Sequence, residues 1–332
     1  MTARAFAPGR VNVIGDHTDY TSGFVLPMAI DLGTTVAVER GGDRVELRSD
    51  DDPDPARVPL QVTSPDLVEP RWARYVAGVV AELRPAVGAR GTVRTTLPLG
   101  AGLSSSAALE VAVALALGFD GDSRSLAQLC QRAEQQASGV PCGIMDQLTS
   151  AAGVDGALLL VDCRTLDVTP VELSEDVAVI VVDSGERRFL ASSAYAARRA
   201  ECAAAEAVIG PLRDATMDDL TALDDPVLVW RAKHVVTENA RVLAFVEALR
   251  AGNLSGAGAL MTASHASLRD DFEVSTPGLD ALVDRLVATP GVHGARLTGG
   301  GFGGSVVALA DPGVDVGGRR VRPSAGATVD LS

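Results

Sequence analysis

The sequence predicts an α+β protein built from two domains, residues 1–174 and 175–332. Two patterns support this prediction. In the first half, short β-prone runs surround an apolar helix that directly follows a loop rich in glycine and serine. In the second half, several helical patterns lead into two apolar strands that enclose a run of glycines. A chain of 332 residues is long enough for two domains of ordinary size.

Composition limits the partners that the protein can have. The chain is 47% hydrophobic and carries a net charge of −14, which argues against binding to nucleic acid or to an anionic membrane surface. A nucleotide is compatible with this charge because local dipoles and a metal ion can hold it. The four cysteines show no C-x-x-C spacing, and the first residues contain no apolar signal-peptide core. We therefore expect a cytoplasmic protein with reduced thiols, and we expect it to be a monomer.

The first candidate site follows a short buried strand at Val11–Ile14. The strand runs into a dense set of polar residues, Asp16, His17, Thr18, Asp19 and Tyr20. Alternating hydrogen-bond donors and acceptors on a loop suit a polyhydroxylated ligand such as a sugar. A solvated turn is the ordinary alternative, because Asp, Thr and Gly favour turns. Arg10, just upstream of the strand, favours a binding loop because a plain turn does not require it.

The next elements are expected to be structural. Two strands, Thr34–Glu39 and Arg44–Arg48, flank a pair of glycines that marks a turn. Apolar residues at helical spacing predict a helix over Trp72–Leu83, and Trp72 itself is typical of a core residue. A further strand is expected over Thr92–Leu97.

The stretch Pro98–Glu110 is the strongest candidate for a phosphate site. It places two glycines and three consecutive serines between a predicted strand and an apolar helix that runs to Gly118. Glycine allows the backbone to approach a ligand closely, and a helix N-terminus offers free N–H groups. Serine hydroxyls can bind phosphate oxygens or a hard cation. The alternative is a well-capped buried helix, since Ser is a preferred N-cap residue.

Two carboxylates follow on the next helical segments. The helix predicted over Ser123–Ser138 places Glu134 beside its apolar stripe, where an unpaired carboxylate is costly, although exposure at the surface is the ordinary alternative. Asp146 lies early in the helix that follows Pro141 and Gly143. It is either a helix cap or a carboxylate directed at a site, where a general base would be useful.

The second half alternates between helices and apolar strands. Strands are predicted over Ala157–Asp162, Val177–Asp183, Gly294–Thr298 and Ser305–Ala310, and helices over 192–210, Asp225–Arg250, Leu254–Leu268 and Pro277–Ala288. The glycine run between the last two strands permits close backbone approach. The tail, residues 311–332, is predicted to be irregular with at most a short closing strand.

Together these segments resemble the galactokinases of the GHMP kinase superfamily. Three stretches carry the resemblance: GRVNVIGDHTDY at 9–20, LPLGAGLSSSAA at 97–108 and LTGGGFGG at 297–304. The resemblance implies a two-domain GHMP kinase fold. In that fold a ribosomal-protein-S5-like N-terminal domain meets a ferredoxin-like α/β sandwich, and the active site lies in the cleft between them. It also implies ATP-dependent phosphorylation of the C1 hydroxyl of galactose, with ATP and Mg²⁺ as the cofactors.

The resemblance also implies a role for each candidate residue. Asp146 would accept the proton of the sugar C1 hydroxyl, and Arg10 would stabilise the alkoxide and the transferring phosphoryl group. Ser106 and Glu134 would ligate Mg²⁺, and Trp72 would lie on or near adenine. The remaining residues would form the sugar pocket (Asp16, His17, Thr18, Asp19, Gly143 and Tyr195) and wrap the triphosphate (Gly100, Ala101, Gly102, Leu103, Ser104, Ser105 and Ser106).

The chain departs from the family pattern in three places. Asp16 stands where the family usually has Glu, so that one contact to a sugar hydroxyl is a methylene shorter. The chain also begins close to its first motif, and residues 311–322 are too short and too rich in Gly and Pro for the helix that relatives have there. Asp16 leaves open a GHMP-type kinase that acts on another monosaccharide. A non-catalytic galactose and ATP sensor is a further alternative, which the retained Ser106, Arg10 and Asp146 disfavour.

Overall fold

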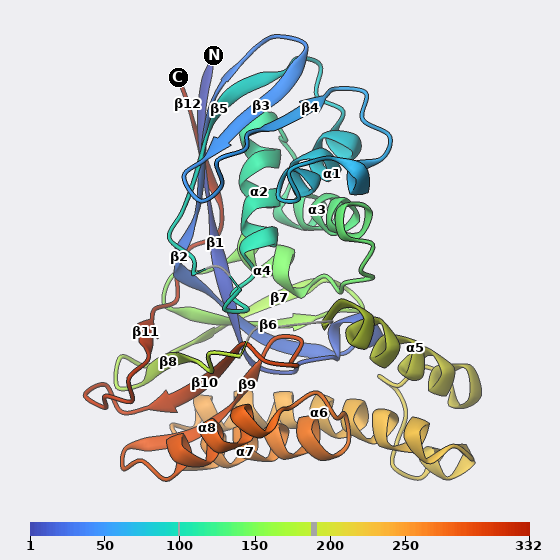
Figure 1. The fold of residues 1–332 in the computed structure, drawn as a ribbon. Coiled ribbons are helices and arrows are strands. Elements are labelled where there is room, and N and C mark those ends of the chain that lie inside the picture. The colour runs from blue at the N-terminus through green and yellow to red at the C-terminus, as the bar shows by residue number, and fades with distance from the viewer. Residues whose placement is uncertain (99, 187–190) are drawn as a thin grey trace.

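The computed structural model of the chain describes residues 1–98, 100–186 and 191–332. Two sheets lie one above the other in Figure 1. The upper, eight-stranded sheet consists of β1 (Thr2–Ile14), β2 (Phe24–Arg40), β3 (Arg44–Ser49), β4 (Ala56–Pro59), β5 (Ala89–Thr95), β6 (Ala157–Asp162), β7 (Asp167–Glu172) and β12 (Thr328–Leu331). The lower, four-stranded sheet consists of β8 (Ala178–Asp183), β9 (Val292–Thr298), β10 (Ser305–Ala310) and β11 (Arg319–Val321). The predicted α+β class is confirmed.

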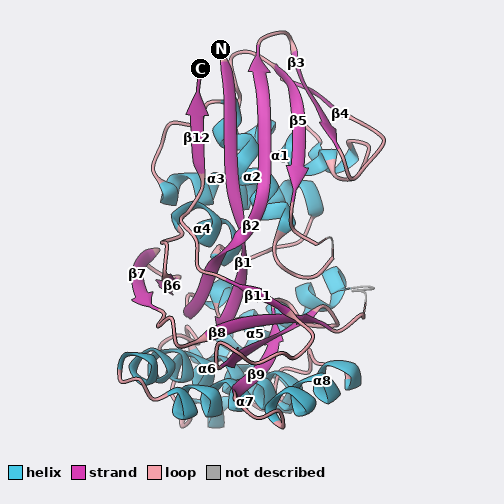
Figure 2. Cartoon of the chain, turned by 90° about the vertical axis from the view of Figure 1, so that its left-hand side faces the viewer, coloured by secondary structure: helices cyan, strands magenta, loops and turns pink. Residues whose placement is uncertain are grey.

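The upper sheet has the strand order β12-β1-β2-β5-β3-β4, which Figure 2 shows face on. The strands β6 and β7 extend it from the first residues of β2. Gly41 and Gly42 join β2 to β3, as the sequence predicts. The two strands do not pair, however, because β5 lies between them, antiparallel to β2 and parallel to β3. A turn signal therefore locates the strands without identifying their partners.

One face of the upper sheet is covered by helices (Figure 1), namely α1 (Ala73–Leu83), α2 (Ser105–Leu117), α3 (Ser123–Ser138) and α4 (Met145–Ala152). The helix α2 is almost completely buried, in agreement with its continuous run of Ala, Val and Leu. Its partner α3 begins where the side chain of Asp122 accepts the Ser125 N–H and ends at Gly139, which is left-handed. This packing directs the N-terminus of α2 toward the lower sheet (Figure 1).

The helices α6 (Pro226–Arg250), α7 (Leu254–Asp270) and α8 (Pro277–Val287) cover the lower sheet, and α5 (Ala191–Ile209) packs against α6. The opposite face of this sheet shares a core with β1, since Val179 and Val307 belong to the same apolar cluster as Val11 and Val13. The end of β1 therefore lies at the junction of the two sheets. Within the described ranges, no helix combines the length and the apolar character needed to cross a bilayer.

The tail forms two short strands, β11 and β12, and residues 311–327 contain no helix. The predicted closing strand is β12, which pairs with β1 at residues 3–6. The backbones of Thr2 and Ser332 exchange hydrogen bonds of 2.8 and 3.1 Å. The expected boundary at residue 174 falls between β7 and β8, where the chain passes from the upper sheet to the lower one. Although the sequence assigns β12 to the second domain, this strand returns to the upper sheet.

Candidate active site

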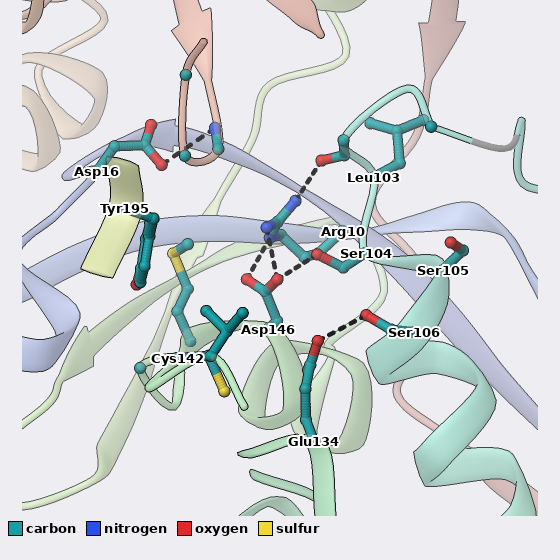
Figure 3. Close-up of a pocket in the computed structure, with 18 of the residues that line it drawn as sticks. Arg10, Asp16, Leu103, Ser104, Ser105, Ser106, Glu134, Cys142, Asp146 and Tyr195 are labelled. Atoms are coloured by element: carbon teal, nitrogen blue, oxygen red, sulfur yellow. Dashed lines mark hydrogen bonds and ion pairs between the residues drawn. The ribbon is translucent and has the colours of Figure 1, made fainter. Parts of the chain in front are cut away.

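A cavity of about 990 Å³ lies where three loops meet. These are the polar loop (residues 15–23), the serine loop (residues 98–106, of which Leu99 lies outside the described residues) and the glycine run (residues 299–304). The cavity brings together most of the predicted site residues (Figure 3): Arg10, Asp16, His17, Asp19, Gly100, Gly102, Leu103, Ser104, Ser105, Ser106, Glu134, Gly143, Asp146 and Tyr195.

Arg10 and Asp146 form the centre of the cavity. The Nε and Nη2 atoms of Arg10 each donate a 2.6 Å hydrogen bond to one carboxylate oxygen of Asp146. The third donor, Nη1, lies 2.7 Å from the carbonyl oxygen of Gly102. Arg10 is 5% exposed, and such a bidentate ion pair fixes both side chains. A strand of the sheet, the serine loop and α4 are thereby joined at one point.

The serine loop presents the N-terminus of α2 to the cavity. Ser104 occupies the N-cap position with a left-handed φ of 59°, but its side chain makes no capping hydrogen bond. Its hydroxyl instead donates to Asp146 Oδ2. The first N–H groups of α2 therefore lack the side-chain cap that an ordinary serine N-cap provides, and they can bind an anion. The geometry favours a phosphate cradle over a simply capped helix.

Glu134 and Ser106 provide oxygen atoms next to this cradle. Ser106 Oγ donates to Glu134 Oε1 at 2.9 Å, and Gln147 Nε2 lies 2.5 Å from Glu134 Oε2. Burial, followed by repulsion from Asp146, raises the pKa of Glu134 to about 7. A buried carboxylate with a raised pKa is stabilised in its charged form by a cation. The carboxylate and hydroxyl pair fits Mg²⁺, which binds few protein oxygens together with substrate phosphates and water.

Asp19 lies on the side of the cavity that the polar loop forms, against the backbone of Gly143. Burial and the charge of Asp146 raise the pKa of Asp19 to about 6. A Cβ atom on Gly143 would lie only 1.8 Å from Asp19 Oδ2, so a larger residue at this position would displace the Asp19 carboxylate. Two carboxylates, Asp19 and Asp146, thus face the same space, where hydroxyl groups of a ligand can donate to them.

An aromatic wall closes this end of the cavity. His17 Nδ1 lies 2.9 Å from the hydroxyl of Tyr20, and the His17 ring lies 5.4 Å from that of Tyr195. Burial lowers the pKa of His17 to about 3, so that its imidazole is neutral. A neutral imidazole and a phenol can each donate or accept a hydrogen bond, which suits a neutral polyhydroxylated ligand.

Three predicted site residues do not line the cavity: Thr18, Ala101 and Trp72. The Thr18 hydroxyl lies 2.9 and 2.7 Å from the carbonyl oxygens of Gly15 and Phe24, so it holds the polar loop together. Ala101 belongs to the serine loop, but it is buried, and its carbonyl accepts the Ser305 hydroxyl. Trp72 packs against the upper core and donates its Nε1–H to Asp54 O, while its neighbour Arg71 lines the cavity. Its contact with adenine remains a prediction.

The structure adds lining residues that sequence reasoning does not identify, namely Arg71, Gln147, Asp183, Glu186 and the backbone of residues 299–301. Two of them had a sequence signal, because Gln147 adjoins Asp146 and the glycine run permits close approach. Asp183 is the last residue of β8 and Glu186 follows this strand, and no recognisable sequence pattern marks either residue. They reach the cavity only because the lower sheet packs beneath the serine loop.

The fold and this site define a kinase of the GHMP class. Residues 74–154 match the family model "GHMP kinases N terminal domain", and residues 245–316 match "GHMP kinases C terminal". A third model, the "Galactokinase galactose-binding signature", matches residues 2–40, which include the polar loop.

Comparison with whole proteins narrows the family. Galactokinase from Homo sapiens is 44% identical over 324 residues, which cover 92% of this chain and 83% of the human protein. Galactokinase from Chloroflexus aurantiacus is 46% identical over 332 residues, covering 93% and 84% of the two chains. The crystal structure of Lactococcus lactis galactokinase complexed with galactose has a TM-score of 0.88 at 32% identity, covering 98% of this chain and 95% of that one. The chain belongs to the galactokinase family.

Proposed function

We propose that this protein transfers the γ-phosphoryl group of ATP to the anomeric C1 hydroxyl of galactose, giving galactose 1-phosphate and ADP. The observation that carries the proposal is the bidentate Arg10–Asp146 pair, which lies between the phosphate cradle and the polar loop. The relative from Lactococcus lactis holds galactose, which supports this sugar as the acceptor.

In the proposed reaction, Asp146 accepts a hydrogen bond from the C1 hydroxyl and takes its proton. The hydroxyl oxygen forms a bond to the γ-phosphorus as the bond from that phosphorus to the ADP oxygen breaks. Arg10 lies against Asp146 and beside Gly102 of the cradle, where its charge stabilises the transferring phosphoryl group. Asp16, His17, Asp19, Gly143 and Tyr195 bind and orient the sugar. Positioning and electrostatics supply the catalysis.

The serine loop binds the triphosphate through the N–H groups at the start of α2. Ser106 and Glu134 hold Mg²⁺, which neutralises phosphate charge when bound. Gln147 keeps the Glu134 carboxylate in place through its 2.5 Å contact, so that one oxygen stays beside Ser106. The cavity is lined by six carboxylates, namely Asp16, Asp19, Glu134, Asp146, Asp183 and Glu186, so a cation also reduces the repulsion that the nucleotide meets there.

A panel of monosaccharides tests the proposal. Purified protein is incubated with ATP, Mg²⁺ and one sugar at a time, and ADP release is measured by a coupled assay. Galactose is expected to support turnover best, and no turnover with galactose would overturn the proposal. Turnover with a different sugar, such as L-arabinose, would identify another GHMP-type sugar 1-kinase, an alternative that Asp16 motivates. Binding of galactose and ATP without turnover of any sugar would indicate a sensor.

A further inference from the structure

Arg296 is a completely buried cation of the second domain that reaches the polar loop of the first. It lies on β9, and its Nη2 atom is 2.7 Å from Asp16 Oδ2. The other oxygen, Asp16 Oδ1, accepts the N–H of Gly299 at 3.1 Å, which Figure 3 marks with a dashed line. These two contacts to the Asp16 carboxylate come from β9 and the residue that follows it, and the side chain of Asn12 on β1 is a further partner that lowers the pKa of this carboxyl group. Asp16 itself belongs to the cavity wall.

The helix α6 braces the same loop from the other side. Glu238 Oε1 accepts the Gly15 N–H at 3.0 Å, and His234 Nε2 lies 3.1 Å from the carbonyl oxygen of Asp16. Arg296 also lies 3.9 Å from Glu238 Oε1 and donates to the carbonyl oxygen of Val13 at 3.2 Å. The guanidinium therefore sits between two buried carboxylates, at the point where β1 ends and the polar loop begins.

A buried arginine lowers the stability of the fold unless carboxylate or carbonyl groups pair with its charge. Stabilisation of the lower sheet alone does not explain Arg296, because its contacts go to Val13 and Asp16 of the first domain and to Glu238, which itself binds Gly15. Its guanidinium instead lies against the Asp16 carboxylate and lowers the pKa that burial raises.

We propose that Arg296 is a positioning residue for the sugar site, which holds the Asp16 carboxylate in its sugar-binding orientation and thereby sets the affinity for the sugar without touching it. The inference rests on the proposed function, in which Asp16 binds the sugar. The second domain thus contributes to sugar recognition through an ion pair that crosses the domain junction, while the ATP cradle is formed by the first domain.

The charges around Asp16 give this inference a pH signature. Asp16 is faced by Arg296 from β9, by Arg10 from β1, by Glu238 and His234 from α6, and by Asp19 of the polar loop. Burial raises the pKa of Asp16, and Arg296 is the strongest of the influences that lower it. Without Arg296, the carboxyl group binds its proton more tightly. The pH at which sugar affinity changes is then expected to move upward.

The test compares Arg296→Met with Arg231→Met. Arg231 is a matched control: it is a buried arginine of the second domain, 2% exposed, that pairs with Glu201 and Glu273 and has no contact with the polar loop among the described residues. Both variants are expected to unfold at a lower temperature. Arg296→Met alone is expected to raise the KM and the calorimetric Kd for galactose at least tenfold, with the KM for ATP changed less than twofold and the pH profile of galactose affinity shifted upward.

Two further variants separate positioning from folding. Arg296→Lys keeps the charge and is expected to recover part of the galactose affinity. The double variant Asp16→Asn with Arg296→Met removes both charges; it is expected to recover thermal stability but to bind galactose no better than either single variant. Galactose affinity within twofold of wild type in folded Arg296→Met, or an equal loss in Arg231→Met, would overturn the inference. Wild-type protein that does not use galactose would overturn the proposed function as well, whereas an active wild type with an unchanged variant overturns the inference alone.

Discussion

Gly143 and Asp19 approach each other so closely that no side chain fits between them. A Cβ atom added to Gly143 would lie 1.8 Å from Asp19 Oδ2 and 2.1 Å from its Cγ, and the backbone of Gly143 has no left-handed φ that would itself forbid alanine. The absence of a side chain at Gly143 thus leaves the space that the Asp19 carboxylate occupies in the proposed sugar pocket.

Gly143→Ala is therefore expected to displace Asp19 and to raise the KM for galactose about tenfold or more, with little change in the KM for ATP. Steady-state kinetics with each substrate varied in turn measure this split. Gly313→Ala is the matched control, because a Cβ there meets open space. A Gly143→Ala enzyme with an unchanged KM for galactose would show that Asp19 does not contact the sugar.

Asp146→Ala is expected to abolish most turnover while ATP still binds. Loss of a group that accepts the reacting proton typically costs about 10²–10⁴-fold in rate, and here Arg10 also loses its partner. Single-turnover kinetics together with calorimetric ATP binding measure both effects. Asp155→Ala, which changes an exposed carboxylate beyond α4, is expected to leave both unchanged. Near-full activity of Asp146→Ala would refute the assigned role.

Glu134→Gln and Ser106→Ala are expected to raise the Mg²⁺ concentration needed for half-maximal activity about tenfold. Glu134→Gln removes the negative charge and Ser106→Ala removes the hydroxyl oxygen proposed to hold the ion, whereas the sugar side of the cavity is untouched. The measurement is a Mg²⁺ titration of activity, together with calorimetric binding of Mg²⁺ and ATP. An unaltered Mg²⁺ requirement in both variants would place the metal elsewhere.

Asp19→Asn is expected to stabilise the protein at alkaline pH while it weakens sugar binding. The pKa of Asp19 is raised from an ordinary value of 3.8 to about 6 in the folded protein, so the folded state holds the proton more tightly. The stabilisation from that proton is complete below about pH 4 and is lost as the pH rises through 6. At pH 8 the variant should therefore unfold at a higher temperature than wild type, with a free energy of unfolding larger by at most about 3 kcal/mol. At pH 4 the two proteins should unfold at similar temperatures. A stability difference that does not grow with pH would contradict this assignment.

Asp16→Glu is expected to preserve or improve the use of galactose. The longer side chain extends farther into the cavity, and Arg296 and the Gly299 N–H remain available to hold it. The kcat/KM for galactose, compared with that for the other sugars of the panel, measures the effect. Complete loss of galactose use in this variant would mean that the pocket is shaped for a different sugar.

The residues that could be predicted from the sequence lie in continuous stretches. Ser104–Ser106 and Asp16–Asp19 have local signals, since each follows a strand and places several polar groups where a core would otherwise continue. The fold class follows for the same reason, because hydrophobic periodicity is local. The predicted ends of α3, β6 and β10 agree with the structure for this reason too.

The remaining features depend on contacts between distant segments. The position of β5 between β2 and β3 is not encoded in the turn that joins them. Thr18 is a residue type that could bind a ligand. Its hydroxyl instead hydrogen-bonds to nearby backbone carbonyl groups of the protein. Arg296 is a single charge within an apolar strand, and only the packing of β9 against the end of β1 brings it to Asp16. Sequence patterns identify such residues by type but cannot assign their partners.

The return of β12 to β1 means that the chain crosses between the two sheets twice, once between β7 and β8 and once between β11 and β12. A single linker would allow the two halves to rotate freely about one point. Two crossings instead tie the halves together at two places, which resists twisting of one half against the other. The crossings and the apolar core that Val11 and Val13 share with Val179 and Val307 therefore keep the glycine run and Arg296 of the lower half in register with the polar loop of the upper half.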